Sequence, residues 1–275
     1  METLIIELFE KNKNTPTTLP NKFLADEFID KLFNMLFVNG AVNYKNIDEF
    51  RNEFLQLEIS FCELLKTGKT TEENAKKHCT AFFEKLPLIY SNAILDAKAI
   101  LEFDPAAMSL DEVIQAYPGF YAIAVYRISH ILWQQKVTSL SRLFAEKAHC
   151  KTGIDIHPGA QIGQAFAIDH GTGIVIGETA VIGNRVKIYQ GVTLGALTVS
   201  KENVSKKRHP TIEDGVIIYS SATILGGTTT IGRESIIGGN VWLTESVPPY
   251  SVVFHKSEIK IKNNSPFAEP INFII

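Results

Sequence analysis

The chain has 275 residues, 45% of them hydrophobic and 21% charged, as in an ordinary soluble globular protein with room for two modest domains. Its formal net charge of −3 provides no overall basic field, so nucleic acid is not an expected partner. No apolar run approaches the ~18 residues that cross a bilayer, and the start, METLIIELFEKNKN, lacks the apolar stretch of a signal peptide. These features predict a cytoplasmic protein with no membrane partner.

The first part of the chain, residues 1–150, is predicted to be all helical, because its apolar residues recur at three- and four-residue steps. Residues 72–103 are expected to carry one or two helices, interrupted at Pro87, and a further helix is expected at about 120–136. The two clearest apolar faces are formed by Phe23, Leu24, Phe28, Leu32, Met35 and Leu36, and by Phe54, Leu57, Phe61, Leu64 and Leu65.

The cysteines are Cys62, Cys79 and Cys150, and no two of them form a CxxC pair. An odd number without such a pair predicts reduced cytosolic thiols, with neither a disulfide framework nor a zinc site. All three precede the repeats described next. A thiol nucleophile is therefore not expected in the second half of the chain.

Asp104 and Pro105 form a short signal between two predicted helices. An Asp-Pro pair before a helix is typical of an N-cap and turn. From this pattern alone, we favour a capping role for Asp104 over a functional one.

From Ile156 onward the apolar residues recur every six positions, a period that fits neither a helix nor a simple strand. It fits a β-solenoid, with one short strand and one turn per hexad and three hexads per coil. About five coils are expected over residues 151–250, ending near Pro248 and Pro249, because proline cannot donate to the ladder. The repeating apolar positions are Ile156, Ile162, Ile168, Ile176, Ile182, Ile188, Leu194, Ile212, Ile218, Ile224, Ile231, Ile237 and Leu243.

The repeat slips by two residues after Ile168, and Asp169 and His170 lie inside this slip. A break in a regular repeat is where a functional site is expected. Asp155 precedes His170 by fifteen residues, close to one coil of roughly 18, which predicts that it stacks beside the histidine. A histidine oriented by a carboxylate is the layout of a general base. From the sequence pattern alone, the simpler interpretation is that His170 is a surface histidine without a role.

The period also disappears over residues 196–208, before His209 and Pro210 return the chain to the coil. Insertions in repeat proteins often lie on the binding face, although a solvated loop is the plainer alternative. His157, His170 and His209 show no close pairing, so no metal site is expected. The cations of the insertion are Lys201, Lys206, Lys207 and Arg208.

Several blocks of the chain resemble the serine O-acetyltransferase family, whose members transfer acetyl from acetyl-CoA to L-serine. The resemblance implies an α+β protein, with an N-terminal all-α helical domain followed by a left-handed parallel β-helix of hexapeptide repeats. It also implies a homotrimer, or a dimer of trimers, with active sites between subunits. The blocks are DIHP at 155–158, IDHGTGIVIGETAVI at 168–182, QGVTLG at 190–195 and RHP at 208–210, with DPA at 104–106 and YRISH at 126–130 in the helical half.

The resemblance also assigns roles within this site. His170 would take the hydroxyl proton of serine, Asp155 would orient His170, and His209 would lie near the developing oxyanion. A zwitterionic substrate needs an acidic patch and a cation at a fixed separation. In agreement with this, the resemblance implies that Asp104 and Asp169 bind the substrate amino group and Arg208 its carboxylate, and that Ala196, Ser220 and Gly239 bind acetyl-CoA, without a metal.

The chain departs from the family pattern where members bind the pantetheine arm. Ala196 stands where a second glycine is usual, the loop before Arg208 is longer and more basic, and Tyr219 to Ser221 replace Gly-Ala-Gly. We expect Lys206 or Lys207 to pair with a phosphate of CoA. The tail, residues 251–275, ends in Ile275, as members that bind O-acetylserine sulfhydrylase do, so this enzyme is a predicted partner.

Two other functions fit the residues less well. A sugar or other small-molecule O-acetyltransferase could use the same solenoid, but a sugar offers no charges to Asp104 and Arg208. A non-catalytic docking scaffold is the alternative outside the enzymes, and it predicts no turnover and no dependence on His170.

Overall fold

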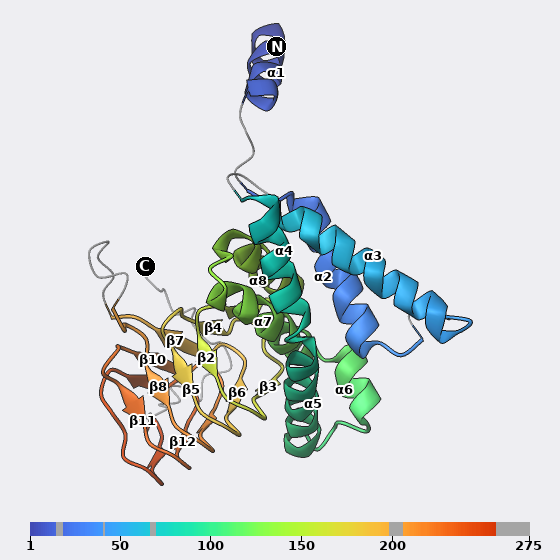
Figure 1. The fold of residues 1–275 in the computed structure, drawn as a ribbon. Helices are drawn as coiled ribbons and strands as arrows, with labels where there is room; N and C mark the ends of the chain where they lie inside the picture. The colour runs from blue at the N-terminus through green and yellow to red at the C-terminus, as the bar shows by residue number, and fades with distance from the viewer. Residues whose placement is uncertain (15–18, 41, 67–69, 198–205, 257–275) are drawn as a thin grey trace, which may run out of the picture.

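The computed structural model describes residues 1–275 except 15–18, 41, 67–69, 198–205 and 257–275. Its helices come first and its strands follow, so that a helical half precedes a parallel β-solenoid (Figure 1). Among the described residues the helices are α1 (Glu2–Asn14), α2 (Lys22–Phe37), α3 (Ile47–Leu65), α4 (Glu72–Phe83), α5 (Leu86–Phe103), α6 (Leu110–Ala116), α7 (Pro118–Gln134) and α8 (Thr138–Thr152).

The helices begin where the sequence provides capping side chains. Asn46 accepts backbone N–H bonds at the start of α3, and Ser109 does so for α6. Pro87 lies in the first turn of α5, where its missing N–H leaves no intrahelical bond unmade. Of the one or two helices predicted over residues 72–103, the structure has two, and the break between them lies just before Pro87. Asp104 is instead the C-cap residue of α5, so its predicted role as an N-cap is wrong.

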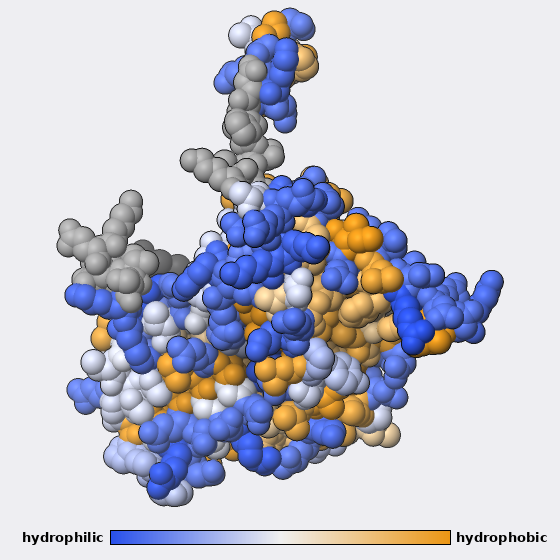
Figure 2. Space-filling view, in the orientation of Figure 1, coloured by the Kyte–Doolittle hydropathy of each residue, from blue (hydrophilic) through white to orange (hydrophobic). Residues whose placement is uncertain are grey.

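Several phenylalanine rings pack against one another in the core of the helical half. Phe28 stacks on Phe61 and on Phe144, with ring centroids 4.8 and 5.7 Å apart, and Phe61 lies 4.4 Å from Phe82. Buried aromatic pairs of this kind contribute about 0.5–1.5 kcal/mol each beyond the burial of their area. By contrast, α1 projects from the body and its apolar side chains are exposed (Figures 1 and 2).

Two of the cysteines form a disulfide, between Cys62 on α3 and Cys79 on α4. The prediction of reduced thiols is therefore wrong for this pair, whereas Cys150 is free. The physical reason is tertiary, because α3 packs against α4 and brings two residues seventeen positions apart into contact. The cytoplasmic prediction consequently loses the support of the cysteines.

The solenoid is a three-sided prism of parallel strands. The first sheet is ordered β1-β4-β7-β10-β13, the second β11-β8-β5-β2 and the third β14-β12-β9-β6-β3. The strands are β1 (Asp155–Ile156), β2 (Gln161–Ile162), β3 (Ala167–Asp169), β4 (Val175–Ile176), β5 (Val181–Ile182), β6 (Lys187–Tyr189), β7 (Thr193–Gly195), β8 (Thr211–Ile212), β9 (Ile217–Ile218), β10 (Thr223–Leu225), β11 (Thr230–Ile231), β12 (Ile236–Ile237), β13 (Trp242–Leu243) and β14 (Val252–Val253).

The six-residue repeat places its apolar side chains inside this prism, as predicted. Ile188, Ile218 and Ile237 of the third sheet, for example, are fully buried. Each such burial stabilises the fold by about 1.5–3 kcal/mol. The solenoid continues past the predicted end, because β14 pairs with β12 after the turn that contains Pro248 and Pro249. Among the described residues, no helix is long and apolar enough to traverse a lipid bilayer.

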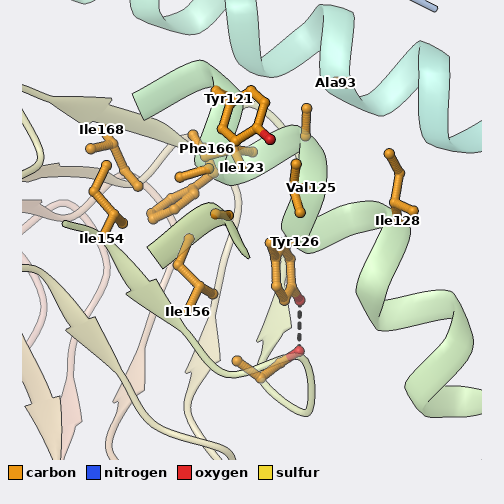
Figure 3. Close-up of a cluster of buried hydrophobic side chains, with 14 of the residues drawn as sticks. Ala93, Tyr121, Ile123, Val125, Tyr126, Ile128, Ile154, Ile156, Phe166 and Ile168 are labelled. Atoms are coloured by element: carbon orange, nitrogen blue, oxygen red, sulfur yellow. Dashed lines mark hydrogen bonds between the residues drawn. The ribbon is translucent and has the colours of Figure 1, made fainter. Parts of the chain in front are cut away.

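A buried ion pair joins the two halves. Arg127 of α7 binds the carboxylate of Asp96 of α5 and also donates to the carbonyl of Gly163, 2.8 Å away. Asp96 in turn accepts the backbone N–H of Phe166 at 2.9 Å. Beside this pair, the Tyr126 hydroxyl donates to the carbonyl of Ala160 at 2.6 Å (Figure 3). These bonds attach α5 and α7 to the first coil.

Candidate active site

Two edges of the prism carry the residues predicted to form the site. The 3–1 edge consists of the turns that lead from the third sheet into the first, and it includes His170. The 1–2 edge consists of the turns that lead from the first sheet into the second, and it includes Arg208 and His209. Both edges border the first sheet.

At the 3–1 edge, the end of α5 meets β3 and β6. Asp104 follows α5, and its carboxylate accepts a hydrogen bond from the Tyr117 hydroxyl at 2.7 Å. Asp169 lies 3.3 Å from the ammonium of Lys187 and 3.6 Å from Nδ1 of His170. The side chain of His170 is 70% exposed, on a turn where its backbone φ is +59°. Asp104 and Asp169 are called the acidic cluster below. The 3–1 edge therefore places the solvent-accessible imidazole of His170 beside the acidic cluster.

The environment of Asp104 favours its ionised form. The hydrogen bond from Tyr117 and a second from the backbone N–H of Ala106 hold the pKa of the Asp104 carboxyl below its ordinary value, and the charge of Lys187 acts in the same direction. The same contact raises the pKa of Tyr117 to about 12, so this hydroxyl stays a donor at neutral pH. Asp104 is thus a fixed negative charge that can accept an ammonium group.

At the 1–2 edge, one threonine organises the cationic residues. Oγ1 of Thr179 accepts the backbone N–H groups of Arg208 and His209 at 2.9 and 3.0 Å. The guanidinium of Arg208 pairs with the carboxylate of Glu178, which fixes its direction. Nearby, burial, together with the charges of Arg142 and Arg208, lowers the pKa of His157 to about 4. His157 is therefore neutral at pH 7, and it lies close enough to Arg208 for that charge to affect its pKa.

His209 is prepared to donate a hydrogen bond. Its Nδ1 accepts the backbone N–H of Thr179 at 3.0 Å, which leaves the proton of the neutral ring on Nε2. Burial, together with the positive charges of Arg208 and Lys207, lowers the pKa of His209 to about 4. At neutral pH the side chain is consequently an uncharged N–H donor, as an oxyanion site needs.

The residues predicted to bind acetyl-CoA divide between the same two edges. Ser220 and Gly239 stack on the 3–1 edge, where a Cβ on Gly239 would lie 3.1 Å from the Ser220 carbonyl oxygen. Ala196 follows β7, at the start of the 1–2 edge. In one chain, therefore, the acidic cluster with Ser220 and Gly239 lies on one edge, and Arg208, His209 and Ala196 lie on the other.

Asp155 does not stack on His170 as the spacing predicted. β1 pairs with β4, so Asp155 lies beside Val175, twenty positions later. The coil is longer than eighteen residues here because the slip at His170 adds two. Among the described residues, the carboxylate that lies within ion-pair distance of His170 is that of Asp169, at 3.6 Å. The catalytic role of Asp155 stays a prediction.

Curated relatives of the chain include serine acetyltransferases of several bacteria. The plasmid serine acetyltransferase of Synechococcus elongatus is 47% identical over 204 residues, which cover 72% of this chain and 63% of that protein. The serine acetyltransferase of Mycobacterium tuberculosis is 49% identical over 158 residues, 58% of this chain and 67% of that protein. The chain belongs to the serine acetyltransferase family. No family model matches it.

Solved structures of this family have the same fold. Serine acetyltransferase isoform 3 of Entamoeba histolytica, in complex with cysteine, has a TM-score of 0.76 at 35% identity, covering 90% of this chain and 88% of that one. A serine acetyltransferase in complex with CoA has a TM-score of 0.57 at 30% identity, covering 84% and 94%. The Neisseria gonorrhoeae enzyme in complex with serine has a TM-score of 0.59 at 27% identity, covering 88% and 97%.

Sequence reasoning did not single out four residues of these clusters: Tyr117, Glu178, Thr179 and Lys187. Glu178 and Thr179 lie within the block that resembles the family, so their position was a usable signal. Tyr117 and Lys187 carry no such signal. Tyr117 meets Asp104 only where α6 and α7 pack against α5, and Lys187 meets the Phe103 carbonyl only where α5 packs against the solenoid.

Lys207 is engaged with its own chain. Its ammonium donates to the carbonyl oxygens of Thr179, His209 and Pro210 at 3.0, 2.7 and 3.4 Å. These three carbonyls satisfy the ammonium within its own chain, so the pairing of Lys207 with a phosphate of CoA stays a prediction. Lys206, the other lysine predicted to meet CoA, is exposed. Lys201, a further cation of the insertion, lies outside the described residues.

Gly177 provides the space for the ring of His209. A Cβ at this position would lie 2.0 Å from Nε2 and Cδ2 of that ring. We expect Gly177→Ala to displace the imidazole and to lower kcat about 10- to 100-fold, as for a weakened oxyanion donor. Steady-state kinetics of Gly177→Ala, His209→Ala and the double variant test this. The double variant should be no slower than His209→Ala, whereas additive losses would contradict a shared mechanism.

Proposed function

We propose that the chain transfers the acetyl group of acetyl-CoA to the hydroxyl of L-serine, giving O-acetyl-L-serine. The observation that carries this proposal is the division of charge between the two edges that border the first sheet. One edge holds Asp104 and Asp169 beside an exposed imidazole, and the other holds Arg208 beside a neutral N–H donor. An amino acid with a hydroxyl needs both sets, and relatives in this family have been solved with serine and with CoA.

The site is completed by a second copy of the chain in this proposal. Arranging three first sheets around a threefold axis would bring the 3–1 edge of one copy to the 1–2 edge of the next. The outward row of the first sheet supports this arrangement, because beyond Asp155 at its first strand the residues in register, Val175, Thr193, Thr223 and Trp242, are uncharged. Val175 and Trp242 are 39% and 68% exposed in the single chain. A homotrimer would cover this row.

The reaction then follows from the groups available. Nε2 of His170 takes the serine hydroxyl proton as the hydroxyl oxygen attacks the thioester carbonyl. Nε2–H of His209 donates to the oxygen that becomes negative. When the tetrahedral intermediate collapses, the carbon–sulfur bond breaks, and the imidazolium of His170 returns the proton to the CoA thiolate. Holding both substrates in one site supplies a large part of the rate.

The remaining partners are proposals of the same kind. Ser220 and Gly239 from one copy and Ala196 from the next would contact acetyl-CoA, with Lys206 near its phosphates. O-acetylserine sulfhydrylase would bind through Ile275, which lies outside the described residues. A cytoplasmic location would suit these metabolites.

Replacing the general base tests the reaction. We expect His170→Ala to lower kcat with L-serine by about 10²–10⁴-fold, because the proton of the attacking hydroxyl loses its acceptor. Thiol release from acetyl-CoA, measured with L-serine, other amino acids and sugars, detects this change. Release with a sugar but not with serine would overturn the substrate, and no release with any acceptor would favour a scaffold.

A further inference from the structure

Lys187 is a buried lysine that the proposed mechanism does not use. It lies beside the acidic cluster of Asp104 and Asp169. Its side chain extends from β6 and is about 6% exposed. The ammonium donates to the carbonyl oxygen of Phe103 at 2.8 Å and lies 3.3 Å from the carboxylate of Asp169. A buried ammonium without partners would be strongly unfavourable, so these two contacts determine where it lies.

The contact with Phe103 fixes the end of α5. Phe103 is the last residue of the helix, and its carbonyl is one of the four that have no partner within the helix. A cation at this position is also favoured by the helix dipole. Asp104 follows directly, so Lys187 connects the backbone that carries Asp104 to the side chain of Asp169.

Two aromatic rings lie close to the ammonium of Lys187. Nζ of Lys187 lies 4.5 Å from the ring centroid of Tyr189 and 5.8 Å from that of Phe103. Cation–π contacts of this kind favour one position of a desolvated charge. They therefore restrict the rotamers of a side chain that would be flexible in water.

The charge of Lys187 also balances the cluster. Asp104 and Asp169 together carry two negative charges, and the lysine leaves a net charge of about −1 for ligands, which is matched by one ammonium group. Without the lysine, both carboxylates would lose a positive charge that acts on them, and their mutual repulsion would be less opposed.

We propose that Lys187 is a positioning residue that holds Asp104 and Asp169 at the separation needed to bind the ammonium group of the acceptor substrate. The proposal rests on the proposed function, since it assumes that these carboxylates bind an amino acid. Lys187 does not touch the reacting atoms, so its loss should affect acceptor binding more than the chemical step.

The experiment compares Lys187→Met, Lys187→Arg and Arg185→Met in the full chain. Methionine keeps the volume of the stem and removes the charge, whereas arginine keeps the charge. Arg185 is the matched control, because it also links α5 to the solenoid, through Glu102 at 2.9 Å, but both side chains are more than half exposed. It also lies over the Phe103 ring, at 5.6 Å, but among the described residues its ion pair is with Glu102 and not with Asp169.

We expect Lys187→Met to raise the KM for L-serine about tenfold or more and to lower kcat less than about threefold, as for a lost charge-assisted contact. The KM for acetyl-CoA and the values for Arg185→Met should change less than about twofold, and Lys187→Arg should recover most of the loss. Calorimetric titration of L-serine gives the same comparison without turnover.

Two results would overturn the inference. One is an unchanged KM and Kd for serine in Lys187→Met. The other is an equal loss for serine and acetyl-CoA in both Lys187 variants, together with a lower Tm, which indicates a structural role only. If the wild-type chain neither binds nor acetylates serine, the proposed function itself fails, independently of Lys187.

Discussion

Two inactive variants, His170→Ala and His209→Ala, are expected to restore activity to each other when their subunits assemble together. The reason is the division of the site between edges. His170 lies on the 3–1 edge and His209 on the 1–2 edge of the same chain. In the proposed trimer, each site uses one edge from each of two neighbouring copies, so one pairing of mutant subunits has both edges intact.

The size of the recovery follows from random assembly. With equal amounts of the two subunits, about a quarter of the interfaces combine an intact 3–1 edge with an intact 1–2 edge. Each variant alone should retain at most about 1% of the wild-type kcat. Co-expression with two different affinity tags, sequential purification and measurement of thiol release provide the test.

A matched pair of variants gives the control. His170→Ala and Asp169→Ala alter the same edge, so every mixed interface keeps one damaged 3–1 edge and no recovery is expected. Recovery in this control, or none for His170→Ala with His209→Ala in verified mixed oligomers, would contradict a site formed between copies.

The largest loss of stability is expected for Arg127→Met. This change removes the partner of Asp96, which is fully buried and then carries an unpaired charge. Breaking one side of a buried ion pair lowers the free energy of unfolding by about 3–5 kcal/mol. The Gly163 carbonyl loses its donor as well, so we expect the first coil to separate from α7 early in unfolding. Denaturant titration with probes in each half measures both effects.

A second substitution should reduce this loss. Asp96→Asn removes the charge but keeps an oxygen for the backbone N–H of Phe166, so Arg127→Met combined with Asp96→Asn should be more stable than Arg127→Met alone. The exposed pair of Lys31 and Glu53 is the control, because Lys31→Met should cost less than about 1 kcal/mol. Equal losses for Arg127→Met and Lys31→Met would contradict the argument.

Local patterns in the sequence were sufficient for most of the fold. The six-residue period predicted a solenoid and its buried positions, because each coil repeats the same choice of inward side chain. Helical spacing predicted the first half for a similar reason, since the residues that share a helix face are three or four apart. The slip at His170 identified an exposed imidazole without any tertiary information.

Other features depended on segments that meet only in the folded chain. The disulfide of Cys62 and Cys79 follows from the packing of α3 on α4, and the length of the coil at the slip set the register of Asp155. Lys187 reaches a carbonyl 84 residues away. The sequence by itself therefore determined the fold class and most of the residues proposed for the site. The tertiary structure decided how those residues are divided between two edges, because that division depends on which turn of the prism each one occupies.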